Sequence, residues 1–73
     1  MQEALAALSD AKRQVFVLFE LQGLPGEDIA AALNIPLKTV WSRLFYARKE
    51  FAQAVARQDA QERFLNSRGN RHG

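Results

Sequence analysis

The side chains best suited to chemistry in this 73-residue chain are cations gathered in its middle. Residues 34–57 hold five basic residues against one acid, a charge of +4, whereas residues 1–33 hold two basic residues against five acids, a charge of −3. The remaining residues hold three arginines against two acids, so the formal net charge is +2. A basic segment of this kind is typical of a surface that binds a polyanion, but a solvated helix face gives the same asymmetry. The five cations of the segment are Lys38, Arg43, Arg48, Lys49 and Arg57.

Catalysis and metal binding have little support in the sequence. There is no cysteine, and the single histidine, His72, is the penultimate residue, so no thiolate or imidazole metal site is expected. Ser9, Ser42 and Ser67 lack a histidine base, and there is no glycine-rich phosphate loop. No apolar run approaches the roughly 18 residues of a membrane span, and no signal peptide is evident. We therefore expect a cytoplasmic domain that is not an enzyme, with no metal, cofactor, membrane or small-molecule substrate.

Four helices are predicted to position these cations, which gives an all-α fold class. The alanine- and leucine-rich residues 1–8 suit a short first helix, and no strand alternation is present. A second helix is expected over about residues 10–22, with Ser9 as its N-cap and Gly23 just beyond its C-terminus.

The third and fourth helices are expected to form a helix-turn-helix. The third covers about residues 25–33, with Pro25 in its first turn, and ends at Asn34, a plausible left-handed cap. A turn of three or four residues leads to the fourth helix, over about residues 37–57. The second helix of such a pair enters the DNA major groove. Ile29, Ala32 and Leu33 form the predicted inner stripe of the third helix.

Hydrophobic spacing predicts which face of the fourth helix is buried. Val40, Leu44, Ala47 and Phe51 recur at i, i+4, i+7 and i+11, within one narrow arc. Trp41 and Arg48 lie on one flank of this arc, and Thr39, Arg43 and Glu50 lie on the other. The outward face carries Lys38, Ser42, Phe45, Tyr46, Lys49 and Gln53.

Two aromatic residues, Phe45 and Tyr46, stand on a face that is normally polar. These rings contact the thymine methyl groups or sugars of DNA, or a protein partner, or else they fold back over neighbouring helices. The second helix is also apolar around most of its circumference. Val15, Leu18 and Phe19 suffice for its inner face, so Val17 and Leu21 either pack against the fourth helix or form a docking surface for a partner.

The domain is expected to end with the fourth helix. We place the helix-turn-helix domain at residues 1–58 and a partly disordered C-terminal extension at residues 59–73, where the periodic signal fades. Within this extension, Phe64 and Leu65 either lengthen the fourth helix or pack weakly, and residues 66–73 are expected to form a frayed tail.

Four short runs resemble region 4 of bacterial sigma factors of the sigma-70 family, specifically the extracytoplasmic-function (ECF) group. They are Arg13–Phe16, Glu20–Leu24, Glu27–Ala30 and Thr39–Arg48, and the resemblance covers about residues 4–52. It implies a promoter-reading module that binds the −35 element in the major groove and docks on the β-subunit flap of RNA polymerase. In many ECF factors an anti-sigma factor covers the same surfaces. Because nothing in the chain resembles region 2, we expect it to be the C-terminal domain of a longer sigma factor.

The sequence departs from the family pattern at two positions. Trp41 stands where the family usually has Lys or Arg, and Tyr46 stands where it has the first arginine of an Arg-Ala-Arg run. Two missing cations weaken the counterion release that drives DNA binding. They also remove two candidate guanine readers, each worth about 1–3 kcal/mol of discrimination. We therefore expect an altered −35 preference and weak binding by the detached domain.

The outward register and the resemblance together assign roles along the fourth helix. Ser42 and Phe45 are expected to contact bases or sugars, whereas Arg48 and Lys49 suit phosphates, because flexible cations on a flank usually position the helix. The predicted DNA-binding residues are Lys38, Thr39, Trp41, Ser42, Arg43, Phe45, Tyr46, Arg48 and Lys49.

Arg43 has an alternative structural role, because it lies nearer the core and could pair with Glu27 or Asp28 instead of DNA. Lys38 and Thr39, in the first turn, could add a phosphate site at the positive end of the helix.

Two other functions fit the same residues. One is a sigma-4-like protein-interaction module that Trp41 and Tyr46 have shifted away from DNA. The other is a different helix-turn-helix transcriptional regulator, such as a response-regulator output domain, which the run around residues 42–48 makes less attractive.

Overall fold

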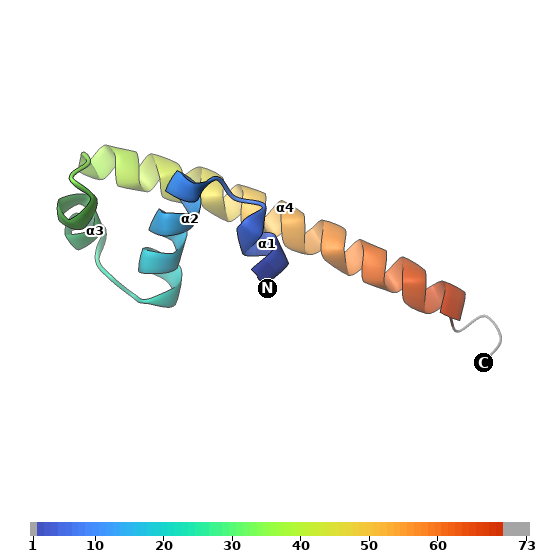
Figure 1. Ribbon diagram of the computed structural model, residues 1–73. Helices are drawn as coiled ribbons and strands as arrows, with labels where there is room; N and C mark the ends of the chain where they lie inside the picture. The colour runs from blue at the N-terminus through green and yellow to red at the C-terminus, as the bar shows by residue number, and fades with distance from the viewer. Residues whose placement is uncertain (1, 70–73) are drawn as a thin grey trace.

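The computed structural model of the chain describes the backbone of residues 2–69 and the side chains of residues 3–65. The described part is helical with no strand, which confirms the predicted all-α four-helix fold with a helix-turn-helix (Figure 1). Met1, where the first predicted helix begins, and the end of the predicted tail, including His72, lie outside the described residues. The elements are α1 (Gln2–Ala6), α2 (Asp10–Phe16), a π-helical turn η1 (Val17–Leu21), α3 (Gly26–Leu33) and α4 (Leu37–Gly69).

The second predicted helix is present, but its last turn is wider than an α-helix. Ser9 is its N-cap, as predicted, and its Oγ accepts a hydrogen bond from the Lys12 backbone N–H at 3.4 Å. In η1 the Gln22 N–H donates to the Val17 carbonyl, five residues back, at 3.0 Å. Gly23 then takes a positive φ of 74°, which ends the helix where a glycine was expected to end it.

The turn between α3 and α4 has the expected cap. Asn34 adopts the left-handed conformation, with φ 56° and ψ 49°, and the Ile35 N–H donates to the Ala30 carbonyl at 3.0 Å. Pro25 has extended backbone angles and is the residue before the helix, so α3 begins at Gly26, one residue later than predicted.

The predicted inner stripe of α3 is wrong at one position. Ile29 is fully buried and Leu33 is partly buried against the core, as expected, but Ala32 is exposed. Ala30 packs against the core in its place, because the buried arc of α3 is centred on Ile29 and takes in its neighbour.

The predicted buried stripe of α4 is confirmed. Val40 and Ala47 are fully buried and Leu44 is 2% exposed. Phe51 is half-buried, and its ring lies 4.7 Å from that of Phe16, centroid to centroid. The core therefore joins the connection between α1 and α2 with α2, α3 and α4, and its buried residues are Leu8, Val15, Phe16, Ile29, Val40, Leu44 and Ala47.

The fourth helix is much longer than predicted. It runs from Leu37 to Gly69, so the expected end near Arg57 is wrong, and residues 59–69 continue the helix. The segment has no proline, and Gly69 is its first glycine, so nothing local interrupts the helix. An i, i+4 ion pair from Arg63 to Asp59, at 2.9 Å, adds to its stability.

The three short helices lie along the N-terminal half of α4, and its C-terminal half projects beyond them as a single rod (Figure 1). A hydrogen bond of 2.5 Å from Gln58 Nε2 to Glu3 Oε2 ties the rod to α1. The placement of the domain boundary at residue 58 stays a prediction.

Neither a membrane-spanning helix nor a cluster of three metal-ligating side chains occurs among the described residues.

Candidate nucleic-acid interface

The start of α4 is fixed by the turn that precedes it. The Pro36 carbonyl accepts hydrogen bonds from the backbone N–H groups of Thr39 and Val40, at 3.0 and 3.2 Å. With Val40 and Leu44 buried beneath it, the helix has one rotational setting, and its opposite side faces solvent. This side is the surface that a helix-turn-helix presents to DNA.

The residues predicted to point outward are exposed. Lys38, Ser42 and Lys49 are exposed, and Phe45 and Tyr46 are 62% and 48% exposed. The two rings contact each other edge to face, with centroids 5.2 Å apart. The aromatic pair therefore stays on the surface of α4, where it can meet a ligand.

Trp41 occupies one flank, as predicted, but it also contacts the interior of the domain. Its ring meets Phe19 of η1 edge to face, with centroids 5.6 Å apart. Its six-membered ring also lies against Gly26, where a Cβ would be only 2.6 Å from Cη2 of Trp41. Sequence reasoning missed both contacts, since residues 19, 26 and 41 share no local pattern. Trp41 remains 45% exposed.

Arg48, on the same flank, is paired within the domain. Its guanidinium donates to Glu20 Oε1 at 2.8 Å and lies 5.5 Å from the centroid of the Phe19 ring. The Arg48 side chain is 53% exposed, so it can still reach a phosphate if the pair opens. Glu20 was not predicted as part of the site, because the partners are 28 residues apart.

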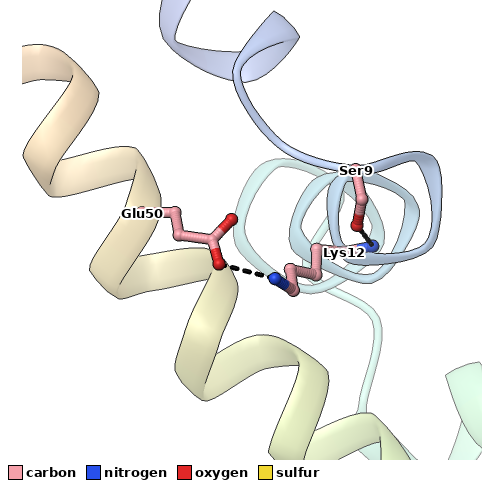
Figure 2. Close-up of polar contacts among 3 residues, drawn as sticks. All are labelled: Ser9, Lys12 and Glu50. Carbon is pink, nitrogen blue, oxygen red and sulfur yellow. Dashed lines mark hydrogen bonds and ion pairs between the residues drawn. The ribbon is translucent and has the colours of Figure 1, made fainter.

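The other flank of α4 carries an ion pair of the opposite polarity. Lys12 of α2 donates to Glu50 at 2.5 Å (Figure 2). The Lys12 ammonium also lies 5.9 Å from the centroid of the Tyr46 ring, within the range of a cation–π interaction. Sequence reasoning placed Lys12 only in the acidic N-terminal segment and missed this role.

Three predicted DNA-binding cations have no ion-pair partner within the described part of the chain: Lys38, Arg43 and Lys49. The alternative role for Arg43 is not seen, since none of these pairs joins it to Glu27 or Asp28. Arg43 and Thr39 are half-buried on their flank.

A second surface lies on α2 and η1, where Val17 and Leu21 are predicted either to pack against α4 or to form a docking surface for a partner. Val17 is half-buried and Leu21 is 49% exposed. Val17 lines an open hollow of about 420 Å³, but Leu21 does not. The hollow is lined by Asp10, Arg13, Gln14, Val17 and Leu18.

These features define a helix-turn-helix domain with a cationic, partly aromatic recognition helix. The chain belongs to the sigma-70 region 4 family: it matches the family described as Sigma-70, region 4, over residues 1–51. This range includes α1 to α3 and α4 as far as Phe51. No curated protein and no solved structure matches the chain significantly. Region 4 domains are DNA-binding regulatory modules that generally recognise the −35 element and bind the β flap of RNA polymerase.

Proposed function

We propose that this domain recognises a promoter −35 element as region 4 of an ECF sigma factor, docks on the β flap and is controlled by an anti-sigma factor. The observation that carries the proposal is the exposed side of α4. Lys38 and Lys49 stand there, opposite the buried stripe, and half-buried Arg43 lies on the flank; none of the three has an ion-pair partner among the described residues. Cations of this kind attract phosphates and release counterions on binding.

Base reading is assigned to the residues between these cations. Ser42 and Phe45 are exposed on the central turns of α4. A serine hydroxyl bonds several base edges, and an exposed phenyl ring suits the methyl group of thymine. Trp41 and Tyr46 replace cations usual in the family, and Arg48 is paired with Glu20. The guanine-reading capacity of the helix is therefore low, which supports an altered −35 preference.

DNA binding is tested by titrating the chain with a panel of promoter duplexes at several salt concentrations. We expect sequence-dependent binding with an affinity that falls as salt rises, because phosphate contacts dominate it. Phe45→Ala is expected to lower discrimination between duplexes, whereas Lys49→Ala weakens all of them. Affinity that is indifferent to both salt and sequence, even with a β-flap fragment present, would refute this function.

The flap is assigned to the hollow on α2 and η1. Val17 and Leu18 give it an apolar lining, and Asp10 and Arg13, which pair with each other, line it as well. A helix or loop end with an apolar tip fits such a hollow. Val17→Lys is expected to abolish co-purification with a β-flap fragment and leave DNA affinity unchanged. Retention of the flap fragment by this variant would place the docking site elsewhere.

The second candidate is a protein-interaction module with little DNA binding. It is favoured by the exposed apolar side chains of Leu21 and Phe45, which are 49% and 62% exposed. If this function is right, Phe45→Ala will weaken an anti-sigma or flap complex more than it weakens binding to any duplex.

A further inference from the structure

Three elements meet at Trp41. The indole belongs to α4, the Phe19 ring at its edge belongs to η1, and Gly26 is the first residue of α3. Trp41 thus touches both α3, the helix that precedes the turn, and η1, the element before α3. Phe45 and Tyr46, by contrast, make a ring contact with each other.

Gly26 makes the contact possible. It is buried, and a Cβ built there would lie 2.6 Å from both Cη2 and Cζ2 of Trp41 and 3.3 Å from Cζ3. The benzene half of the indole therefore rests directly on the backbone of α3. Phe19 holds the ring at an interplanar angle of 84°, so the ring is in contact on two sides. An alanine at position 26 would have to displace the indole, because real Cβ atoms do not come this close to another atom.

The position of Trp41 has a consequence for DNA reading. In a helix-turn-helix, the first helix crosses the phosphate backbone and the second enters the groove, so their relative placement determines which bases the second helix reaches. A flexible cation at position 41 would lack the rigid ring that rests on Gly26. The flat indole lies between α4 and the start of α3, so its thickness bears on the separation of the two helices.

We propose that Trp41 is a positioning residue that sets α3 against the recognition helix, with Gly26 and Phe19 as its counterparts, and that it does not itself read bases. This inference rests on the proposed DNA-binding function. It concerns Trp41, a position at which the chain departs from the family pattern. It predicts that Gly26 and Trp41 act as one unit in DNA recognition.

Fluorescence tests the contact without DNA, because Trp41 is the only tryptophan of the chain. In the full chain, Gly26→Ala is expected to shift the emission to longer wavelength and to increase quenching by acrylamide, since the ring is displaced from its seat. Ala32→Ser, at an exposed position of the same helix, is the matched control and should leave both unchanged. If the emission wavelength and the acrylamide quenching of Gly26→Ala equal those of the wild type, the proposal is overturned.

Binding to a preferred and a scrambled −35 duplex tests the positioning role. Gly26→Ala and Trp41→Ala are each expected to reduce the ratio of the two affinities roughly 10-fold, comparable to one lost base contact, with an unchanged salt slope. The double variant should be no worse than Trp41→Ala, because the added Cβ then has room.

Three results would overturn the positioning role. A change of preference at one base pair only, in Trp41→Ala alone, would make Trp41 a base reader. Lower melting temperatures with an unchanged affinity ratio would make the contact merely structural. If the wild type shows no salt- or sequence-dependent binding, while Gly26→Ala still changes the fluorescence, the proposed function itself fails and only the packing remains.

Discussion

The ion pair between Arg48 and Glu20 is expected to oppose DNA binding, and Glu20→Gln tests this directly. Arg48 is predicted to bind a phosphate, but in the free domain it donates to Glu20 Oε1 at 2.8 Å. Binding DNA must therefore open this pair and leave a carboxylate close to the phosphates. Glutamine keeps the shape of the side chain and removes its charge, so Arg48 is released to DNA more easily.

The expected size of the effect follows from the exposure of the pair. Arg48 and Glu20 side chains are 53% and 33% exposed, so the pair belongs with surface ion pairs worth about 0.2–1 kcal/mol. Removing the competition should thus raise DNA affinity by up to roughly 5-fold. The slope of log affinity against log salt should steepen by at most about 0.9, the contribution of one full phosphate contact. The free energy of unfolding should fall by no more than about 1 kcal/mol.

Glu62→Gln is the matched control for Glu20→Gln. It changes the net charge by the same amount, but Glu62 lies on the projecting half of α4 and has no ion-pair partner among the described residues. Fluorescence anisotropy of a labelled duplex at four or five salt concentrations measures both variants. Equal gains in the two would show that net charge alone is responsible. Weaker binding by Glu20→Gln would show that Glu20 orients Arg48 toward DNA, which refutes the competition.

Three further predictions concern charge, packing and the turn. Tyr46→Arg should steepen the salt slope by about 0.9, by restoring a phosphate contact; an unchanged slope in the same titration would place residue 46 away from DNA. Leu44→Ala should lower the free energy of unfolding, measured in urea, by about 2–5 kcal/mol. Val55 is 42% exposed, so Val55→Ala should lower it by less than about 0.5 kcal/mol. Equal losses in the two variants would contradict the described core. Asn34→Ala should lower the free energy of unfolding by about 1 kcal/mol because Asn34 has a positive φ, whereas Asn34→Gly should leave it unchanged. Chemical denaturation of both variants measures this difference.

Local signals account for the parts of the fold that were predicted. Ser9, Gly23 and Asn34 act through their own backbone and side-chain preferences, so the helix ends they mark were found from the sequence. The buried stripe of α4 was found because periodicity needs only one helix. The length of α4 was missed because hydrophobic spacing fades after Arg57, while helix propensity and the Asp59–Arg63 pair continue without it.

The site shows the limit of the same reasoning. Exposure of the outward residues followed from the register of one helix. The partners of Arg48 and Tyr46 did not, because Glu20 lies on η1 and Lys12 on α2, more than 25 residues earlier in the chain. The need for glycine at position 26 was also not predicted, because it depends on the Trp41 indole, which only the tertiary fold brings against this residue.

The two aromatic substitutions have a common structural effect. Trp41 meets Phe19 of η1, and Tyr46 lies beneath Lys12 of α2, so both positions that usually carry family cations contact the preceding helical elements. At these two positions the usual cations are thus replaced by rings that contact the rest of the domain. The charge available for phosphates is correspondingly small. We therefore expect useful promoter affinity only when the domain is held on RNA polymerase, because tethering raises the effective concentration of the second site and makes up for weak intrinsic binding.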